Sequence, residues 1–586
     1  MPSALIDAFV LAFAGWTVLC HATVLLDASL VALLWAALPA AVAGVFLLRR
    51  LPRPEGSGER ALLGLCLLCA AAVLVAHRPD SDDGLYLGFA GGVADFPRAP
   101  LLKADALHGI PGLPILLSTY RFHSIEALYG AVSYLTGLSV LAVSHLGFAT
   151  LFGFLAPLAW ARLFRVLTPG RWLWGVAGAV GYLLLDGGAH AGWGNLAFVR
   201  LFQGKAAFLT VLSPLVVAYA LAFGAAPTPG NWLRLAAGLV ASAGLTASAL
   251  WAAPLTAAAA LATAWRPNRD GLRAAAGGAA AAAYPLAVAL VLRAGLKEGV
   301  MGQMSLPPGL EGKFLAETLN YVVAQGVHRW ALALLLAAAP YFAPAGAPRR
   351  WAAAASGLFL LLFNPWTGPW VALNLTSPWN YNRLFWLLPV PAAAGLAAAA
   401  EGSRSRRLFA AAVLAAALVP PTYVFGKANG VRLGFPSLKV PAEFPLVRAV
   451  NAGVPGRGIV LAPTEVSNWL VTERGHAYPL LAKEIYFDEL HRFLPAADIA
   501  RRRALMDHVG GERPVRLESP AFRAGLRDYG VAGVVLYAAV PWAAETRGDL
   551  AAAGYSLKLE LYGYELWVGV SVSELSEVRR PLPLRR

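Results

Sequence analysis

The sequence predicts a polytopic α-helical membrane protein with a soluble α/β domain in its C-terminal part. Of its 586 residues, 58% are hydrophobic and 14% are charged, whereas a soluble domain averages about 25% charged residues. Apolar runs of bilayer-spanning length, about 20 residues, recur between residues 7 and 425 and then stop. We therefore expect a transmembrane domain over residues 1–426 and an extracytoplasmic domain over residues 440–586.

The apolar runs predict about thirteen transmembrane helices. Their approximate ranges are 7–26, 28–48, 61–77, 142–163, 172–186, 206–224, 233–248, 250–265, 274–294, 328–345, 351–364, 383–400 and 408–425. The stretch 233–265 could form one kinked helix or two short helices, and this choice changes the parity of the count. Prolines interrupt several runs, and broken backbone at membrane depth is tolerated where it lines a cavity. A cavity within the bundle is therefore expected.

The distribution of charge predicts the orientation. The net charge is +15, and many arginines lie in short clusters between apolar runs. By the positive-inside rule, such clusters mark the cytoplasmic loops. A nucleic-acid-binding protein would concentrate its cations on one face or stripe, so we expect no nucleic-acid partner. With a cytoplasmic N-terminus, an odd number of spans puts the C-terminal domain outside. The Ala-, Gly- and Arg-rich composition is typical of a GC-rich bacterial genome, and we expect a bacterial inner (plasma) membrane protein.

The C-terminal part alternates between helix and strand patterns, which favours a small α/β domain. Predicted helices are 444–452, 498–509, 522–529 and 545–553, and predicted strands are 458–462, 533–537 and 564–570. No glycine-rich phosphate loop opens any of these helices. We therefore assign no catalysis to this domain from its sequence.

The first external loop, residues 78–124, begins with the strongest candidate site. Its first residues include Asp80, Asp82 and Asp83, directly after an apolar run. Clustered carboxylates repel one another and need a cation or a proton nearby. Such a cluster suits a general base, a divalent metal site at Asp80 and Asp82, or both. The alternative is a solvated loop that merely ends a helix.

Cations at the predicted outer membrane edge form a second candidate group. Arg200, Gln203 and Lys205 lead into the run that starts at residue 206, and Arg383 has a similar placement. A lipid phosphate needs cationic partners at this depth, and arginine can bind it with two parallel hydrogen bonds. The alternative is a set of anchors that flank helices, although anchors on this side oppose the positive-inside trend.

Two further stretches follow polar loops. Residues 124–140 have apolar residues at helical spacing and favour an interfacial helix, with His123 and Glu126 on one face. His123 could be a metal ligand or an acid, although an exposed interfacial histidine is more often solvated. An aromatic group could stack on a sugar or form an interfacial belt; its members are Trp366, Trp370, Trp379 and Tyr381.

Several of these motifs resemble the GT-C superfamily of integral membrane glycosyltransferases. The acidic pair Asp82-Asp83, followed by Tyr86, resembles the first external loop of that family. The stretch from His123 to Tyr129 resembles its juxtamembrane helix. The segment Asn380–Pro389 resembles a late span that begins with an Arg-Tyr pair in related enzymes, although here Tyr381 precedes Arg383. As architecture, the resemblance covers most of the chain.

The resemblance implies transfer of a sugar from a polyprenyl-phosphate donor to a glycan, lipid or protein acceptor on the extracytoplasmic face. By it, Asp83 or Asp82 is the catalytic base, and Lys205, Arg200 and Arg383 bind the donor phosphate. Supporting roles fall to Asp80, Gln203, His123, Glu126 and Tyr381. Some members of the family use a divalent cation (Mg or Mn) and others do not.

Two other functions remain open from the sequence. A multi-span transporter or lipid flippase would suit the broken helices, but charges within the spans, expected on a transport pathway, are scarce. A non-catalytic envelope assembly protein would make the C-terminal domain the active part.

Overall fold

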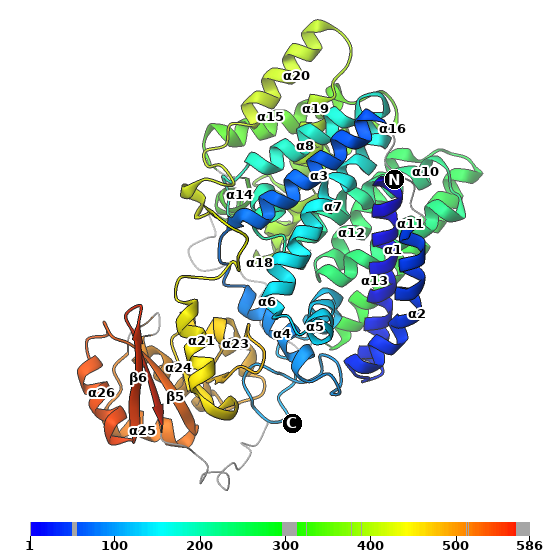
Figure 1. The fold of residues 1–586 in the computed structure, drawn as a ribbon. Coiled ribbons are helices and arrows are strands. Elements are labelled where there is room, and N and C mark those ends of the chain that lie inside the picture. Colours follow the sequence, from blue (N-terminus) through cyan, green and yellow to red (C-terminus); the bar gives the residue numbers. More distant parts are fainter. Residues whose placement is uncertain are drawn as a thin grey trace.

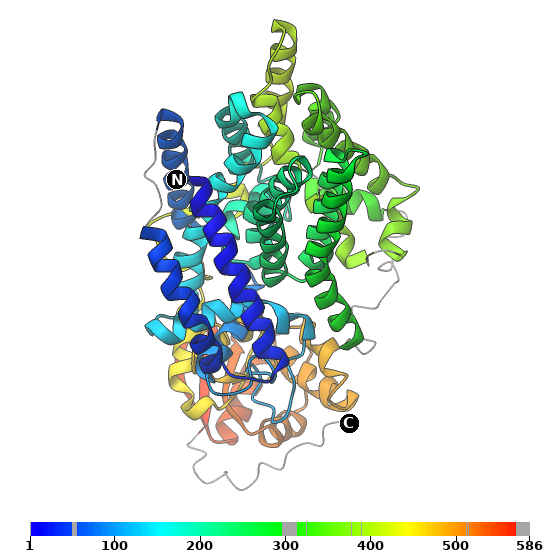
Figure 2. The same ribbon diagram turned by 90° about the vertical axis from the view of Figure 1, so that its right-hand side faces the viewer.

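The computed structural model describes most of the chain. The described residues are 2–49, 56–295, 313–323, 325–374, 376, 378–387, 389–510, 513 and 515–569. They form a mostly helical body and a smaller α/β unit that lies below the body in Figure 1. The N-terminal end of helix α1 and helix α20 lie at the end of the body remote from this unit (Figures 1 and 2).

Five helical segments in the described ranges are long and apolar enough to cross a membrane. They are Ser3–Leu25, Ser57–Val75, Val140–Leu167, Gly204–Ala225 and Arg269–Arg293. A sixth is added if α14 (Phe314–Val323) and α15 (Val327–Phe342), which are bent relative to one another, count as one span. The chain is therefore a multi-pass membrane protein, as its apolar runs predict.

The body contains further helices that are shorter or less apolar. Its elements, besides α14 and α15, are α1 (Pro2–Leu25), α2 (Leu30–Arg49), α3 (Ser57–Val75), α4 (Asp83–Asp95), α5 (Ser124–Thr136), α6 (Val140–Ala142), α7 (Ala149–Leu167), α8 (Trp172–Leu185), α9 (Gly204–Ala207), α10 (Ser213–Ala225), α11 (Pro229–Leu245), α12 (Ala249–Ala264), α13 (Arg269–Gly295), α16 (Ala347–Leu362), α17 (Gly368–Asn374), α18 (Pro378–Tyr381), α19 (Val390–Ala398) and α20 (Arg404–Ala417). Residues 233–265 form two helices, α11 and α12, because the chain is extended at Thr246.

The last two predicted spans differ from the helices in the structure. Arg383 lies in a 3₁₀ turn, η7 (Asn382–Leu387), and the α-helix begins only at Val390. Proline favours the first turn of a helix and disfavours its interior, which explains a helix start beside Pro391. Helix α20 ends at Ala417 rather than near residue 425, just before the pair Pro420–Pro421. The predicted external segment 295–327 is described only in part, because residues 296–312 lie outside the described ranges.

The first external loop is more ordered than its sequence predicts. Residues 83–95 form helix α4, which packs against α5. The four glycines of α4 lower its intrinsic helix propensity, and they conceal the helix in the sequence. Helix α5 forms where the amphipathic pattern predicts it, and most of its residues are buried. The expectation that His123 is exposed is wrong, since only 5% of its surface is accessible.

The C-terminal unit is built around one mixed sheet, and every predicted helix and strand in it is present. The strand order is β4-β3-β5-β7-β6, with β3 parallel to β4 and β5, and β7 antiparallel to β5 and β6. The strands are β3 (Ile459–Leu461), β4 (Tyr478–Pro479), β5 (Val531–Tyr537), β6 (Tyr555–Leu561) and β7 (Tyr564–Gly569). The helices are α21 (Phe444–Gly453), α22 (Thr464–Leu470), α23 (Ile485–Leu490), α24 (Ala496–Val509), α25 (Ser519–Asp528) and α26 (Ala543–Ala552). Strands β4 and β6 and helices α22 and α23 were not predicted.

The segment that enters the C-terminal unit returns to the end of helix α3. Strand β1 (Ala76–His77) pairs antiparallel with β2 (Arg432–Leu433). Nearby, the buried Lys439 donates through Nζ to the carbonyl oxygens of Val73, at 2.7 Å, and Ala76. A cation suits the carbonyl end of a helix, which carries a partial negative charge. Lys439 therefore caps α3 just before the acidic cluster.

Candidate functional site

The acidic cluster contacts both the helical body and the C-terminal unit, through Lys205 and Lys483 respectively. Three π-helical turns of the body surround it: η2 (Val143–Phe148), η4 (Asn195–Val199) and η5 (Phe208–Leu212). Such turns are rare in proteins overall, and those that occur often lie at functional sites. His145 lies in η2, Arg200 directly follows η4, and Lys205 precedes η5. The side chains of these three residues contact the three aspartates.

Asp82 is held between two lysines. Its Oδ2 lies 2.7 Å from Lys205 Nζ, and its Oδ1 lies 3.0 Å from Nζ of Lys483, a residue of the C-terminal unit. Burial alone would raise the pKa of Asp82, but the two lysines outweigh burial and hold this pKa below its ordinary value. The side chain stays 37% exposed. Asp82 is therefore an ionised carboxylate that solvent and ligands can reach.

Asp83 has the opposite environment. Its side chain is buried, and Oδ2 lies 3.2 Å from Nε2 of His145. The backbone N–H of Lys439 donates to Nδ1 of that histidine, so the proton is on Nε2 and His145 donates to Asp83. Burial raises the pKa of Asp83 well above its ordinary value, and the charges of Asp80 and Asp82 raise it further. The pKa values of the two neighbouring aspartates are thus shifted in opposite directions, and only Asp82 is accessible.

Asp80 is paired with Arg200. The Nε of Arg200 lies 2.5 Å from Asp80 Oδ2, and its Nη2 lies 2.7 Å from Nε2 of His190. Burial, followed by the cations of Arg200 and Arg78, lowers the pKa of His190 to about 4. A neutral His190 can accept the hydrogen bond from Arg200.

The acidic pair Asp80 and Asp82 does not fit a divalent-metal site in this arrangement. Each carboxylate is already ion-paired with an arginine or lysine. Within the described ranges, no group of three or more His, Cys, Asp or Glu residues lies close enough together to hold a metal ion. The predicted metal role of these two residues therefore has no support from the side-chain arrangement.

The described residues line two cavities of different character, and the acidic cluster lines the first of them. The first has a volume of about 620 Å³ and is polar, with Asp80, Asp82, Arg78, Arg200 and His190 among its lining residues. The second has a volume of about 930 Å³ and lies within the helical body. Its lining is mainly apolar, from α7, α10, α12, α16 and α19, as the broken helices predict. We call them the polar cavity and the apolar cavity.

Arg383 is the cation of the apolar cavity. It lines the cavity together with Ser248, and Arg383 Nη1 donates to Ser248 Oγ at 2.7 Å. The structure therefore separates Arg383 from Arg200, which lines the polar cavity. The sequence groups these two arginines with Lys205 as one phosphate site, but in the structure each has a different carboxylate or hydroxyl partner.

Tyr86, on helix α4, lies beside one of the two lysines that hold Asp82. The Nζ of Lys205 lies 5.6 Å from the centre of the Tyr86 ring. Burial raises the pKa of Tyr86, Asp82 raises it further, and Arg383 opposes both. Because both charged groups act on Tyr86, the carboxylate at the polar cavity and the guanidinium at the apolar cavity lie near the same side chain.

His123 and Glu126 form a buried pair beside this region, with Nδ1 and Oε2 3.7 Å apart. The N–H of Ala247 donates to Nε2 of His123, so the proton of the neutral ring is on Nδ1, facing Glu126. Burial first, and the cation of Arg383 second, lower the pKa of His123 to about 3. Burial raises the pKa of Glu126. The pair is thus kept uncharged.

The two other supporting residues have buried positions. Gln203 lies beside Asp83 and acts against the rise in its pKa. Tyr381 is fully buried and donates from its hydroxyl to the carbonyl of Leu362. Tyr381 therefore offers no free ring face for a sugar, whereas Trp366 and Trp370 of the same aromatic group are exposed.

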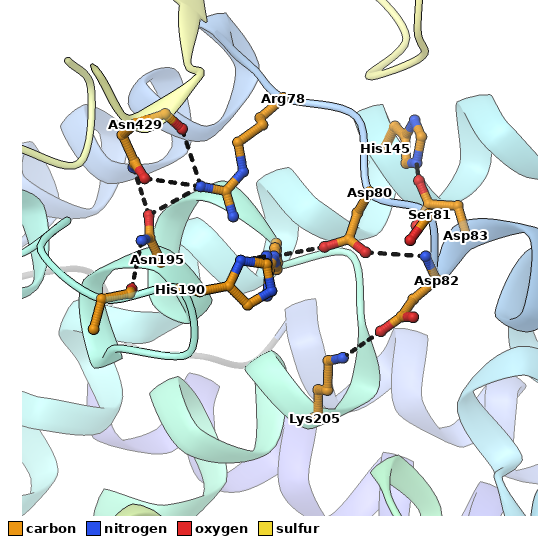
Figure 3. Close-up of polar contacts among 12 residues, drawn as sticks. Arg78, Asp80, Ser81, Asp82, Asp83, His145, His190, Asn195, Lys205 and Asn429 are labelled. Atoms are coloured by element: carbon orange, nitrogen blue, oxygen red, sulfur yellow. Dashed lines mark hydrogen bonds and ion pairs between the residues drawn. The ribbon is translucent and has the colours of Figure 1, made fainter. Parts of the chain in front are cut away.

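Sequence reasoning missed Lys483, Arg78, Asn429 and Lys439. Lys483 belongs to the domain to which no catalysis was assigned, and Lys439 lies just before that domain. Arg78 donates through Nη1 to Oδ1 of Asn429 at 2.9 Å and to Asn195 (Figure 3). The only local signal was the position of Arg78, two residues before Asp80 in a loop otherwise rich in acid.

In comparisons with known proteins, no family model and no curated protein matches this sequence.

Proposed function

We propose that the protein is a GT-C-type membrane glycosyltransferase that transfers a sugar from a polyprenyl-phosphate donor to an acceptor on the extracytoplasmic face. One observation carries the proposal. An apolar cavity with an arginine in its lining lies in the same helical body as an accessible carboxylate that is held by two lysines. An apolar tunnel for a lipid, cations for a phosphate and a base for a hydroxyl are the three elements that this transfer needs.

The proposed topology is about thirteen transmembrane helices in a bacterial inner membrane, with a cytoplasmic N-terminus and an extracytoplasmic C-terminal unit. The N-terminal end of α1 and the C-terminal unit lie at opposite ends of the body (Figures 1 and 2). Helix α20, which begins with Arg404, Arg406 and Arg407, lies at the same end as the N-terminus. This supports the orientation expected from the positive-inside rule.

The isoprenoid chain of the donor would lie in the apolar cavity, with its phosphate between Arg383 and the lysines. Burial of apolar surface stabilises such a complex by about 25 cal/mol per Å². The acceptor would enter the polar cavity, where Asp82 lines the wall. The reacting sugar carbon would then lie between the two cavities, near Tyr86.

The two lysines regulate the base in this proposal. Without a ligand, they hold Asp82 ionised and lower its pKa, which makes it a weak base. An incoming phosphate competes for Lys205 and Lys483 and so raises the proton affinity of Asp82. As the bond from the sugar carbon to the phosphate oxygen breaks, its electron pair leaves with the phosphate. The acceptor oxygen bonds to that carbon, and its proton passes to Asp82.

Sugar transfer in proteoliposomes tests the proposal. The purified protein is supplied with a panel of polyprenyl-phosphate sugars and a crude envelope fraction as acceptor. Transfer of label from one donor to the acceptor is the expected result. Movement of an intact lipid-linked donor between leaflets, with no transfer, would overturn the proposal and favour a flippase.

Filling the apolar cavity should weaken donor binding. Ala355 lines this cavity and is buried, so Ala355→Phe places a ring where the lipid chain would lie. We expect the KM for the donor to rise about tenfold, because a few buried methylene groups of about 0.8 kcal/mol each are lost. Ala353→Phe on the exposed face of the same helix is the control. An equal rise in KM for both variants would argue against the cavity as the lipid site.

Removal of Lys483 should move the pH profile. The lowered pKa keeps Asp82 ionised even at pH 3.8, the ordinary pKa of an aspartate side chain. In the wild type, protonation of Asp82 should therefore cause no fall in kcat/KM at any pH above 3.8. In Lys483→Ala, one of the two cations is lost and the pKa of Asp82 rises, which shifts the acidic limb upward. The profile of kcat/KM reports the free enzyme, and an unchanged profile would remove Lys483 from the site.

A further inference from the structure

The polar cavity carries more positive charge than the proposed reaction requires. Its two carboxylates, Asp80 and Asp82, are already matched by Arg200 and by two lysines. Arg78 also lines the cavity. Among the described residues, Arg78 makes no ion pair, and its Nη1 is held instead by neutral side-chain oxygens of Asn195 and Asn429. The cavity therefore has an excess positive charge at Arg78.

The remaining nitrogen of Arg78 lacks a partner. Its Nη2 is buried and makes no hydrogen bond to any described residue. A buried guanidinium nitrogen without an acceptor destabilises the protein, because its lost hydrogen bonds to water are not replaced. Burial, followed by repulsion from Arg200, lowers the pKa of Arg78 to about 10 against the opposing attraction of Asp80, so Arg78 stays charged at neutral pH. Two mutually repelling guanidinium groups at one polar cavity are stabilised when an anion lies between them.

The asparagines keep Arg78 in this position. Asn429 donates through Nδ2 to the side-chain oxygen of Asn195 and to the carbonyl of Val424 at 2.8 Å. Its own Oδ1 then accepts from Arg78 (Figure 3). A carboxylate at residue 429 would neutralise the guanidinium, whereas an amide fixes its direction and leaves its charge available.

We propose that the polar cavity binds an anionic group, a phosphate or a sugar carboxylate, between Arg78 and Arg200. Under the proposed function the donor phosphate is bound by Arg383 and the two lysines, none of which lines the polar cavity, so the group belongs to the acceptor. The acceptor is then a phosphorylated or acidic glycan or glycolipid whose hydroxyl faces Asp82. This identification of the ligand as an acceptor rests on the proposed function, whereas the anion site itself does not.

Binding of small anions to the purified, detergent-solubilised protein tests the inference without any transfer reaction. The probes are inorganic phosphate, glucuronate and neutral glucose, and the dissociation constants are measured by calorimetry. We expect at least one anion to bind and glucose to show no binding. A preference for phosphate indicates a phosphorylated acceptor, and a preference for glucuronate indicates an acidic sugar. Absence of anion binding would overturn the inference.

Two variants locate the site. Arg78→Gln should weaken anion binding at least about tenfold, which corresponds to about 1.4 kcal/mol. Asn429→Asp keeps the side-chain size, places a carboxylate beside Arg78 and should weaken binding similarly, so the test survives if one variant fails to fold. Arg98→Gln, at an exposed position of the first external loop, should bind as the wild type does. Unchanged affinity in both folded site variants would overturn the inference.

A competition experiment distinguishes acceptor from donor. Farnesyl phosphate should bind together with the small anion, because its lipid chain takes the apolar cavity. Displacement of the small anion by farnesyl phosphate would instead assign the polar cavity to the donor and overturn the acceptor assignment. Anion binding in a protein that transfers no sugar would overturn the proposed function alone. Transfer without anion binding would overturn this inference alone.

Discussion

Asp82→Asn should lower the rate of sugar transfer about a thousandfold, within the range of 10² to 10⁴ found when a general base is removed. The carboxylate of Asp82 is accessible and lines the polar cavity, and an amide of the same size cannot take the acceptor proton. The initial rate in proteoliposomes measures the effect. Asp27→Asn is the matched control, because Asp27 is also accessible and pairs with a lysine, Lys103, at 2.6 Å.

Asp83→Asn distinguishes the two neighbouring carboxylates. Burial raises the pKa of Asp83, and the amide of Asn has the shape of the protonated acid and can still accept from His145. We expect transfer to stay within about tenfold of the wild type, far less loss than removal of a general base causes. If Asp83→Asn abolishes transfer in folded protein and Asp82→Asn does not, the base is Asp83 and the proposed roles are exchanged.

Gly84→Ala should destabilise the protein by about 2–3 kcal/mol, the upper part of the range for overpacked interiors. A Cβ atom at Gly84 would lie 2.1 Å from the carbonyl oxygen of Asn468, on helix α22 of the C-terminal unit. Backbone cannot yield as a flexible side chain does, so α4 and α22 must separate. Asn468 also donates to the carbonyl of Ser81 at 2.8 Å, and Lys483 would be pulled from Asp82.

The same helix offers the control for this substitution. A Cβ atom at Gly91 would meet its nearest neighbour, the carbonyl oxygen of Val471, at an ordinary 3.7 Å. Gly91→Ala should therefore be neutral or stabilise α4 by about 0.5–1 kcal/mol, since alanine is the better helix former. Thermal unfolding in detergent compares the two variants. Equal melting temperatures would mean that α4 and α22 do not pack as tightly as the structure has them.

Local patterns in the sequence predicted much of the fold. Apolar runs identified the membrane body, and alternation in the C-terminal part identified strands such as β5 and helices such as α24. Helix α4 was missed because its glycines oppose helix formation locally, and only close contacts with α22 and with the loop residues Ala106 and Leu107 explain them. The short helices α19 and α20 were predicted too long, because hydropathy does not register where prolines end a helix.

The candidate site was predicted in its residues but not in its pairings. The clustered aspartates and the cations Arg200 and Lys205 stood out by position alone. Asp82 is accessible and Asp83 is buried because of the direction in which the first turn of α4 runs. The sequence does not reveal this direction, since the two adjacent residues are identical. The partner Lys483 lies 401 residues from Asp82 in the chain, and no local pattern connects the two.

The cap that Lys439 forms on α3 also determines when the site can exist during synthesis. The carbonyl of Val73 and the lysine that caps it are 366 residues apart in the chain, and domains form in order as the ribosome releases them. The C-terminal end of α3 must therefore wait, without the cap that Lys439 provides, until nearly all of the membrane body has been synthesised. Lys483 arrives later still. A nascent or truncated chain thus has the aspartates and Lys205 but lacks Lys439 and Lys483, and the protein gains a complete site only at the end of its biogenesis.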